Sequence, residues 1–385
     1  MVKYYQRKVV SEMKSPIIFS FFSGSGFLDL GFEHAGFDIR FVNEFYLPFL
    51  KAYKYSRSQM GIESPEYGYS TANIESFLDD PNRAYLQHLV EDAKLTSRFV
   101  GFIGGPPCPD FSVGGKNRGR EGEHGKLTKT YIDIVIDTKP DFFIFENVKG
   151  LWRTKNHREF YEELKHRLYE NGYIFTDRLT NCIEFGVPQD RDRIIMFGIQ
   201  EKIISTFDKS SLDKDFAWEK YKRYNASEVF NKVIWPSTEL YKEEYYRHMP
   251  EHINGFHKLT VQYWFEKNNV EQHPNSIHYF KPRAGLKKFQ VIAEGDDSKK
   301  SYKRLHRWRY SPTAAYGNNE VHLHPYKSRR LSVAEALAIQ SLPAEFSLPE
   351  DMSLSNMFKT IGNGVPYLAA LGIANTVYDF LRSLR

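Results

Sequence analysis

Short apolar runs and amphipathic stretches alternate along the first two hundred residues of the chain. The apolar runs are bounded by polar or glycine-rich breaks, which is typical of buried strands, and we expect strands at Ile17–Phe22, Ile39–Asn43, Phe99–Ile103, Phe142–Phe145, Ile174–Leu179 and Arg193–Gly198. Apolar residues at helical spacing lie between them, at Leu28–Ala35, Lys129–Asp137 and Glu159–Asn171. Strands that alternate with helices predict an α/β fold with a mostly parallel sheet covered on both faces.

This alternation stops near residue 205. Residues 205–310 are rich in Tyr, His, Lys and Asn, and their apolar positions show little periodicity. Helical periodicity returns at Ser332–Leu342 and, after a predicted tight turn at Gly362-Asn363-Gly364, from Pro366 to Leu384. We therefore divide the chain into an α/β domain (1–204), an irregular second domain (205–312), a hinge with one helix (313–360) and a C-terminal helix that returns to the first domain (361–385).

Length, composition and charge set broad limits. The 385 residues, 41% of them hydrophobic, are enough for two domains. No apolar stretch reaches transmembrane length, and the first fourteen residues are polar and charged, unlike a signal peptide. The two cysteines, Cys108 and Cys182, exclude a disulfide framework and a cysteine-rich zinc site, and we expect no metal. These features predict a soluble protein of a reducing cytoplasm. The net charge of +5 is compatible with a polyanionic partner without requiring one.

Cys108 lies in the most informative stretch, Gly104-Gly105-Pro106-Pro107-Cys108-Pro109-Asp110-Phe111-Ser112. A predicted strand ends here, and two glycines and three prolines hold the backbone in a defined open turn. Loops at strand ends carry reactive groups in open α/β sheets, so a thiolate here would be an exposed nucleophile. A lone cysteine is more often a buried structural residue. The prolines and glycines argue against that alternative.

A glycine-rich turn, Phe22-Ser23-Gly24-Ser25-Gly26, follows the first predicted strand and leads into a helix. Such a turn lets the backbone approach a ligand closely, and Glu44, at the end of the second strand, is the kind of residue that binds ribose hydroxyls of an adenosine-containing cofactor. The next glycine is Gly31, so the dinucleotide pattern G-x-G-x-x-G is absent. This weakens a nicotinamide interpretation and leaves S-adenosylmethionine, which needs no pyrophosphate cradle. A structural glycine turn without a ligand is the alternative.

Two further polar groups lie at the ends of predicted strands. Glu146 follows a fully apolar strand, where a buried carboxyl group could hold or donate a proton near neutral pH. The alternative is a surface glutamate that caps the following helix. The run Gln189-Asp190-Arg191-Asp192-Arg193 precedes the last strand. Its arginines could fix a polar base edge, or they could pair with the two aspartates as a solvated charge run.

In this order, the pieces resemble the C5-cytosine DNA methyltransferase family. The resemblance consists of the turn at 22–26, Pro107-Cys108, Glu146-Asn147-Val148, the Q-x-R-x-R pattern of Gln189, Arg191 and Arg193, then Arg330-Leu331-Ser332 with Glu335 and Gln340-Ser341-Leu342-Pro343, and finally Gly362-Asn363-Gly364-Val365-Pro366. It covers about residues 16–200 and 311–385. Residues 205–310 match no motif, as expected for that family's variable target-recognition region.

The resemblance implies a Rossmann-like S-adenosylmethionine-dependent catalytic domain with a smaller, irregular target-recognition domain. It implies a catalytic site of Cys108, Glu146, Arg191, Arg193, Gln189 and Pro107. It also implies a cofactor site of Phe22, Ser23, Gly24, Ser25, Gly26, Phe27, Leu28, Glu44, Asn73, Ile74, Pro106, Leu127, Asn363, Gly364 and Val365. Asn363 and Val365 should then lie beside the cofactor turn.

Three positions depart from the family pattern. Phe27 stands where the family commonly has a third glycine, and Asn73 stands where an acidic residue often contacts the adenine amino group. Pro109 replaces the more usual glutamine after the cysteine. The first two make the details of cofactor contact uncertain, and none of the three removes a catalytic group.

The resemblance implies covalent chemistry at Cys108. C5 of cytosine is too weak a nucleophile to attack a methyl sulfonium, so the thiolate adds to C6 and places electron density at C5. Glu146 would bind N3 and the exocyclic amine, Arg193 would bind O2, and Arg191 would support the pocket. The cytosine must leave the stack to be reached. The glycine-rich and basic loop Gly114–Lys126 could close over it, although a simple surface loop is the alternative.

Basic residues are concentrated before residue 310. Ten Lys or Arg against three acids lie between Lys281 and Tyr310, with aromatic residues among them. Phosphate-neutralising side chains near aromatics suit a DNA surface, whereas a charge run can also be a plain solvated face. We expect DNA contacts from Lys287, Lys288, Lys303, Arg304, Arg307 and Arg309.

The resulting hypothesis is a DNA (cytosine-5)-methyltransferase that makes 5-methylcytosine in a specific duplex sequence. Only about sixteen residues precede the first strand, which fits a compact prokaryotic enzyme: a cytoplasmic monomer, associated with the nucleoid through DNA and paired with a restriction endonuclease. A tRNA cytosine-5 methyltransferase and an inactive DNA-binding protein on the same scaffold are the alternatives. A nicotinamide-dependent oxidoreductase is disfavoured by the glycine spacing.

Overall fold

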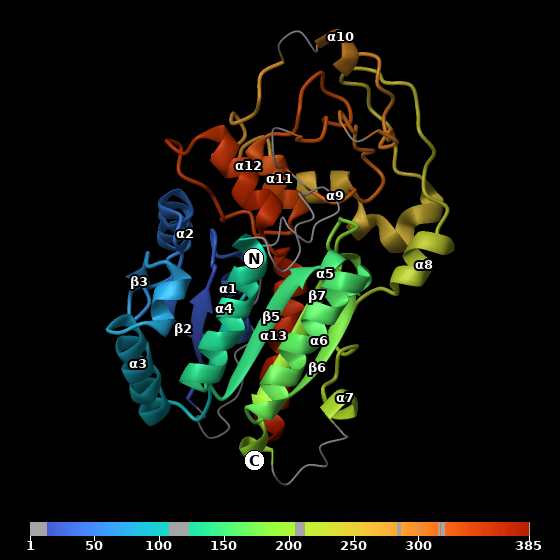
Figure 1. Ribbon diagram of the computed structural model, residues 1–385. Helices are drawn as coiled ribbons and strands as arrows, with labels where there is room; N and C mark the ends of the chain where they lie inside the picture. Colours follow the sequence, from blue (N-terminus) through green and yellow to red (C-terminus); the bar gives the residue numbers. More distant parts are fainter. Residues whose placement is uncertain are drawn as a thin grey trace.

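One twisted sheet forms the lower part of the molecule (Figure 1). The computed structural model describes residues 14–107, 123–204, 212–282, 286–299, 301–314, 316 and 320–384. Its strands are β1 (Ile17–Phe21), β2 (Asp38–Asn43), β3 (Tyr69–Ser70), β4 (Val100–Gly104), β5 (Phe142–Val148), β6 (Tyr173–Asn181) and β7 (Asp192–Gln200), in the order β3-β2-β1-β4-β5-β7-β6. Strands β1 to β5 pair in parallel, whereas β7 is antiparallel to both β5 and β6. The predicted α/β fold with a mostly parallel sheet is confirmed.

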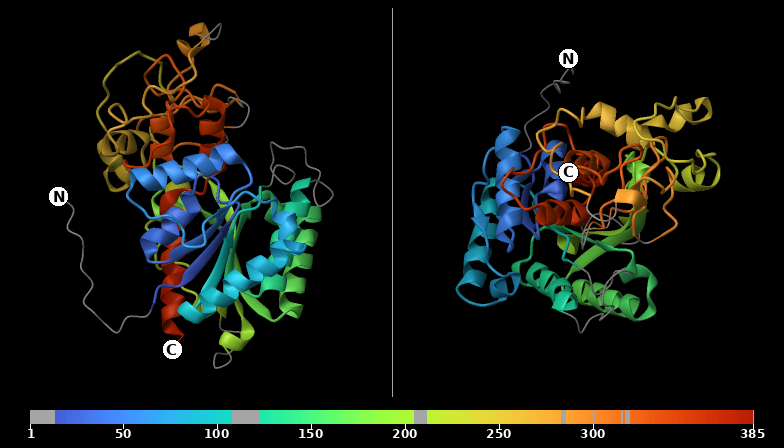
Figure 2. Two further views of the ribbon diagram at one scale, coloured as in Figure 1. Left: turned by 90° about the vertical axis from the view of Figure 1, so that its left-hand side faces the viewer. Right: turned by 90° about the horizontal axis from the view of Figure 1, so that it is seen from above.

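Helices cover both faces of this sheet (Figures 1 and 2). Helices α1 (Phe27–Ala35) and α13 (Tyr367–Ser383) pack on one face, and α3 (Asn82–Thr96), α4 (Glu123–Thr138) and α6 (Lys155–Glu170) pack on the other. Successive side chains of a strand point to opposite faces. Ile18 therefore joins the core with Ile373 of α13, whereas its neighbour Phe19 joins the core with Leu86 of α3. The other helices of the catalytic half are α2 (Leu47–Gln59), α5 (Gly150–Arg153) and α7 (Leu212–Asp215). Helix α7 lies beyond the predicted boundary at residue 204, yet Leu212 joins the core of the sheet.

The C-terminal helix returns to the first domain, as predicted. Its backbone comes so close to α1 that a Cβ atom on Gly31 would lie 2.6 Å from the backbone of Ala370. The predicted tight turn at 362–364 is wrong, because helix α12 (Leu354–Asn363) continues through Gly362 and Asn363. Only Gly364, Val365 and Pro366 connect α12 to α13. The glycine spacing that suggested a turn instead allows close packing, since a Cβ on Gly364 would overlap the ring of Phe27.

The second domain has little regular structure in the part of it that is described. Its short helices are α8 (Ala226–Asn231), α9 (Val261–Lys267) and α10 (Leu286–Phe289), and α11 (Val333–Ile339) and α12 follow. The predicted boundary at residue 312 divides segments that the structure holds together, because Leu323 forms backbone bridges with both Arg304 and Arg330. Within the described ranges, no helix is long and apolar enough to cross a membrane.

Candidate active site and cofactor turn

The candidate site lies at one edge of the sheet, where parallel strands end. The turn at 22–26 follows β1, Glu44 follows β2, and Gly105–Pro107 follow β4, while Glu146 lies near the end of β5. Parallel strands bring their carboxyl ends to the same edge, and open α/β sheets bind ligands there. The residues that the sequence singled out are thus gathered at this edge by the topology.

Glu146 and Arg193 form a buried ion pair. The antiparallel register of β5 and β7 sets Val148 opposite Arg193, and Nε of Arg193 lies 2.6 Å from Oε1 of Glu146. The two side chains are 10% and 12% exposed. The alternatives of a surface helix cap for Glu146 and of a solvated charge run for Arg193 are therefore wrong. A carboxylate and a guanidinium held side by side offer both a hydrogen-bond acceptor and donors to a planar polar ligand.

The chain that leads to Cys108 lies against this pair. A Cβ atom on Gly105 would lie 2.7 Å from Oε2 of Glu146, and the Asn147 side chain donates to the carbonyl of Pro106 at 3.5 Å. Pro107, which is half-buried, is the last described residue before Cys108. Cys108 itself and residues 114–122 of the predicted closing loop lie outside the described residues.

Replacing Gly105 by alanine is expected to reduce methyl transfer at least tenfold while the free energy of unfolding changes little. The new methyl group would overlap Oε2 of Glu146 and displace the carboxylate, and a displaced hydrogen-bonding group costs about 1–3 kcal/mol. Single-turnover rates and thermal unfolding of the Gly105→Ala variant measure the two effects. The control is Gly255→Ala, since nothing lies within 4 Å of a Cβ there and its φ is not in the left-handed region. A rate equal to that of the unaltered protein would show that Glu146 is not held as described.

Arg191 and Gln189 are buried, and both bond to segments that are distant in the sequence. Arg191 donates to the carbonyls of Gly362 at 2.7 Å and Gly364 at 3.1 Å, and burial lowers its pKa to about 9. Oε1 of Gln189 accepts from the amide of Ala314 at 3.0 Å. Arg191 is thus a positioning residue that ties the C-terminal segment to β7, and the charge-run alternative is wrong for it as well.

The cofactor turn has the open geometry that a ligand needs. Phe22, Gly24 and Gly26 all have positive φ (53°, 57° and 81°), and a Cβ on Gly24 would meet only one atom, at 4.0 Å. The carboxylate of Glu44 accepts from the amides of Gly24 at 2.8 Å and Tyr46 at 2.7 Å, and burial raises its pKa. Each oxygen retains a lone pair for a ligand hydroxyl.

Several predicted cofactor side chains lie elsewhere. The Ser25 hydroxyl is 2.7 Å from the Thr360 hydroxyl, and Leu28 is buried in the core beneath the sheet. Phe27 is 2% exposed and packs edge-on against Phe346, so the residue that departs from the family pattern belongs to the core of the second half. The side chains of these three predicted cofactor residues are enclosed by protein. Only their backbone remains available.

The remaining predicted cofactor residues surround the turn in different ways. Ile74 is buried and Asn73 is exposed, with its side chain accepting from the Glu75 amide at 3.2 Å. Pro106 is buried, and Leu127 is half-buried against the core on the α4 face. Asn363 is exposed and Val365 is buried, and the neighbouring contacts of Thr360 and Gly364 bring their segment to the turn. Sequence reasoning missed Thr360, and it placed Gln340 in a motif without a role. The Gln340 side chain donates to the carbonyl of Ile361 at 2.5 Å.

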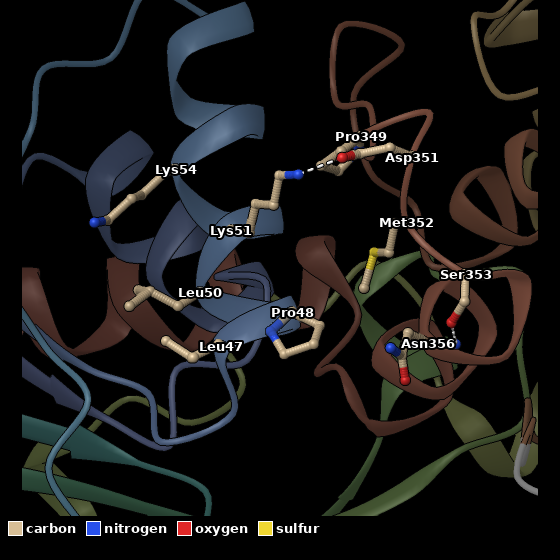
Figure 3. A pocket seen from close by; sticks show the side chains of 10 residues that line it. All are labelled: Leu47, Pro48, Leu50, Lys51, Lys54, Pro349, Asp351, Met352, Ser353 and Asn356. Atoms are coloured by element: carbon tan, nitrogen blue, oxygen red, sulfur yellow. Dashed lines mark hydrogen bonds and ion pairs between the residues drawn. The ribbon is translucent and has the colours of Figure 1, made fainter.

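A cavity of about 560 Å³ lies between α2 and the segment before α12 (Figure 3). An ion pair of Lys51 with Asp351 crosses it, and Tyr46 donates to Asn356 at 3.2 Å nearby. None of the residues predicted for catalysis or cofactor binding lines it. The cavity therefore belongs to the contact between the two halves of the molecule.

The predicted DNA-contacting residues divide into two groups. Lys287 and Lys288 on α10 are exposed, and Lys303 and Arg309 are partly exposed. Arg304 is fully buried and donates to the carbonyls of Ile292 at 2.8 Å and Lys327 at 3.2 Å and also to those of Phe289 and His324. Arg307 is 3% exposed and holds Glu294 through two bonds of 2.8 and 2.9 Å. The prediction that Arg304 and Arg307 contact phosphate is wrong, because both guanidinium groups serve the interior.

Two buried histidines lie in the same region and should make its stability depend on pH. Burial lowers the pKa of His322 to about 3 and that of His306 to about 4. The folded state therefore keeps both rings neutral, and the unfolded state takes up protons first as the pH falls below about 6.5. The free energy of unfolding is therefore unaffected by these histidines above that pH, and it decreases as the pH falls toward 4. We expect about 2 kcal/mol for each ring at pH 5.

Unfolding free energies measured between pH 7.5 and 5 in the His322→Gln variant test this expectation. The variant should be less sensitive to acid than the unaltered protein, whereas His166→Gln, at an exposed position, should behave as the unaltered protein does. Equal pH slopes in all three proteins would show that His322 is protonated in the folded state.

Comparison with known proteins places these features in a family. The sequence matches the family described as C-5 cytosine-specific DNA methylase over residues 17–379. It is 56% identical over 372 residues to the type II methyltransferase M.NmeDI of Neisseria meningitidis serogroup C, covering 97% of this chain and 86% of that protein. It is 28% identical to the type II methyltransferase M.FnuDI of Fusobacterium nucleatum, over 94% of this chain and 95% of that protein.

Solved structures show the same fold. A protein described as a prophage-encoded DNA modification methyltransferase of E. coli superposes with a TM-score of 0.64 at 20% identity, over 96% of this chain and 100% of that one. A DNMT2 variant of Spodoptera frugiperda superposes with a TM-score of 0.57 at 15% identity, also over 96% and 100%. The fold is therefore the Rossmann-like methyltransferase fold that the strand order indicated. On its sequence match and on this fold, the chain belongs to the C-5 cytosine-specific DNA methylase family and is a DNA cytosine-5 methyltransferase.

Proposed function

We propose that this enzyme transfers a methyl group from S-adenosylmethionine to C5 of a cytosine flipped out of a specific duplex sequence. The buried pair of Glu146 and Arg193 carries the proposal, because it lies beside the segment Gly105–Pro107 that leads directly to Cys108. A carboxylate, a guanidinium and a thiol at one strand edge are the groups that covalent activation of a pyrimidine needs.

The chemistry follows from the electron demand of the ring. The Cys108 thiolate adds to C6, which forms the S–C6 bond and shifts electron density to C5. Glu146 binds the protonated N3 and the exocyclic amine, and Arg193 donates to O2, so that the developing charge on the ring is neutralised. C5 then takes the methyl group, while the S–CH3 bond of the donor breaks and the donor sulfur keeps that electron pair. A base removes the C5 proton, the C5–C6 double bond reforms, and the S–C6 bond breaks to release the Cys108 thiolate. A water molecule is a sufficient base for that proton.

Bound S-adenosylmethionine would supply the electrophilic methyl group. The chain's own residues fit it: Glu44 would accept from the ribose hydroxyls, and Gly24 leaves open space for close approach. Asn363 is exposed at the end of α12 and would close the site from the opposite side. The departure at Asn73 makes the adenine amino group the contact most in need of measurement.

The second domain would read the duplex, and the target cytosine would leave the stack to reach Cys108. The relative that is 56% identical is called a type II methyltransferase. This supports a role of the present chain as the modification half of a restriction-modification system. We propose that the enzyme acts as a monomer in a prokaryotic cytoplasm, associated with the nucleoid through its DNA substrate.

Bisulfite sequencing of DNA from cells that express the chain tests the proposal directly. We expect that the cytosine of one short sequence is fully protected from bisulfite conversion and that cytosines elsewhere are converted. Purified enzyme with radiolabelled S-adenosylmethionine should label duplex DNA and leave tRNA unlabelled. Labelling of tRNA alone would replace the proposal with the tRNA alternative.

Neutralising the two lysines of α10 should weaken DNA binding without changing the methylated sequence. Each lost phosphate contact is expected to reduce the slope of log affinity against log salt by about 0.9, because one fewer counterion is released. Phosphate contacts position a protein and do not specify sequence. Salt-dependent binding of the double variant Lys287→Gln/Lys288→Gln measures this, with Lys202→Gln, at the opposite end of the sheet, as control. An unchanged salt slope would remove α10 from the DNA surface.

A further inference from the structure

A cluster of buried polar side chains lies directly under the cofactor turn. It consists of Ser20 on β1, Asp29 and Glu33 on α1, and Tyr53 and Arg57 on α2. Asp29 is 0%, Tyr53 1% and Arg57 2% exposed. Buried charges are costly unless they are paired and hydrogen-bonded, so a cluster of this kind needs an explanation.

The cluster touches the turn at Gly26. Nη2 of Arg57 donates to the Gly26 carbonyl at 2.7 Å. A Cβ atom on Gly26 would lie 2.6 Å from Cε2 of Tyr53 and 2.8 Å from Nη1 of Arg57. The φ of Gly26 is +81°, a conformation that side-chain-bearing residues rarely adopt. Two side chains of α2 thus support the turn from below, at the residue where its backbone is most unusual.

Each supporting side chain is itself fixed. The Tyr53 hydroxyl donates to Oδ2 of Asp29 at 3.0 Å, and Oδ1 of Asp29 accepts from Ser20 at 2.9 Å. Arg57 pairs with Glu33 at 3.0 Å and lies over the Tyr53 ring, 4.3 Å from its centre. No member can change rotamer without breaking a contact of another. The turn is therefore supported by a rigid group and not by a single bond.

A contribution to stability does not by itself explain the buried polar groups of this cluster. Buried ion pairs replaced by apolar side chains of similar volume often leave a protein equally stable or more stable. Burial also raises the pKa of Asp29 to about 6, which shows that the site disfavours the charge it carries. Its contact with the cofactor turn explains the cluster better. The cluster supports one end of the turn, and Glu44 supports the other end by accepting from the Gly24 amide.

We propose that Tyr53 and Arg57, oriented by Asp29, are positioning residues that hold the turn Gly24–Gly26 in the conformation that receives the methyl donor. They act through the backbone of the turn and do not touch the donor. The inference rests on the proposed use of S-adenosylmethionine at this turn, and it extends that proposal to residues on α2 that lie outside the sequence motifs.

The test uses the full-length protein and four variants. Arg57→Met removes the bond to the Gly26 carbonyl, and Tyr53→Phe keeps the ring but removes the hydroxyl bond to Asp29 that orients it. Asp29→Asn keeps an oxygen and a donor for Ser20 and Tyr53. Tyr173→Phe is the matched control, because its equally buried hydroxyl bonds to the Pro140 carbonyl at the far edge of the sheet. Two quantities are measured: amide hydrogen exchange of residues 23–28 without cofactor, and the Kd for S-adenosylmethionine by calorimetry.

We expect faster exchange in the turn and an approximately tenfold higher Kd for Arg57→Met, and a smaller change in the same direction for Tyr53→Phe. The kcat at saturating S-adenosylmethionine should stay within twofold. Asp29→Asn should resemble the unaltered protein, and Tyr173→Phe should change neither quantity even where its melting temperature falls.

Unchanged exchange in the turn of both α2 variants would overturn the inference, whatever the cofactor affinity. Faster exchange in a protein that does not bind S-adenosylmethionine at all would support the positioning role and would instead overturn the proposed cofactor. If Arg57→Met fails to fold, Tyr53→Phe carries the same decision, since it removes only one hydroxyl group.

Discussion

Replacing Cys108 by serine is expected to abolish methylation while cofactor binding and the fold are retained. A hydroxyl at neutral pH is a far poorer nucleophile than a thiolate, so addition to C6 should slow by at least about a thousandfold, or about 4 kcal/mol of transition-state stabilisation. The pair of Glu146 and Arg193 and the turn at 22–26 make their contacts without the sulfur. Methyl transfer to duplex DNA, calorimetry with S-adenosylmethionine and thermal unfolding measure the three properties. Turnover near that of the unaltered protein would rule out the covalent mechanism.

The same mechanism predicts a stable adduct with a duplex that carries 5-fluorocytosine at the target. Fluorine cannot leave as a proton does, so the final elimination is blocked and the S–C6 bond persists. The adduct should map to Cys108. Cys182 is 1% exposed and burial raises its pKa to about 12, so it stays a protonated thiol. Cys182→Ala should therefore form the adduct normally, and an adduct at Cys182 would overturn the assignment.

Exchanging the second domain for that of a relative with another target is expected to change the methylated sequence completely. The catalytic groups come from the sheet edge, so the chemistry should continue at a similar rate. The exchanged segment should end near residue 330 and not at 310, because Arg304 donates to the carbonyl of Lys327 and Leu323 bridges both Arg304 and Arg330. Sequencing of methylated sites reports the outcome.

A matched exchange that ends at residue 310 serves as the control for the boundary. It would replace Arg304 and leave the buried carbonyls of His324 and Lys327 in the retained chain without their donor, which costs about 1–3 kcal/mol for each unpaired group. This protein should be poorly soluble, whereas the exchange to residue 330 should be soluble and active. An unchanged target in the soluble exchange would place specificity in the catalytic domain.

The groups at the strand ends could be predicted from the sequence because parallel strands bring their carboxyl ends to one edge of the sheet. Glu44, Glu146 and the glycine turn each end an apolar run, and the parallel pairing of the strands brings them to the same edge. Strand β3, with two residues, is shorter than any pattern can show, and α2 carries polar residues through much of its length. Those two elements were therefore missed, and with α2 the cluster under the turn was missed as well. Asp29 within the apolar start of α1 was the one available signal.

The interior arginines could not be predicted because their partners are backbone carbonyls far away in the sequence. Arg191 donates to the carbonyl of Gly362, which lies 171 residues away in the sequence, and no pattern in either segment indicates this contact. Arg304 and Lys287 belong to one basic run, and only the tertiary fold decides that the first is enclosed and the second is exposed. The number of charged residues in a segment therefore describes its surface only when the buried ones are left out.

The return of α13 to the sheet also sets the order in which the chain can fold during synthesis. The seven strands of the described part are synthesised by residue 200, but the area of the sheet that α13 covers stays open until residues 367–383 follow. At about 5–20 residues per second, that interval lasts about ten seconds or more. Throughout it, the nascent chain exposes an apolar face of its sheet. An apolar surface of this kind favours aggregation, so we expect chaperones to bind the nascent chain before α13 is synthesised.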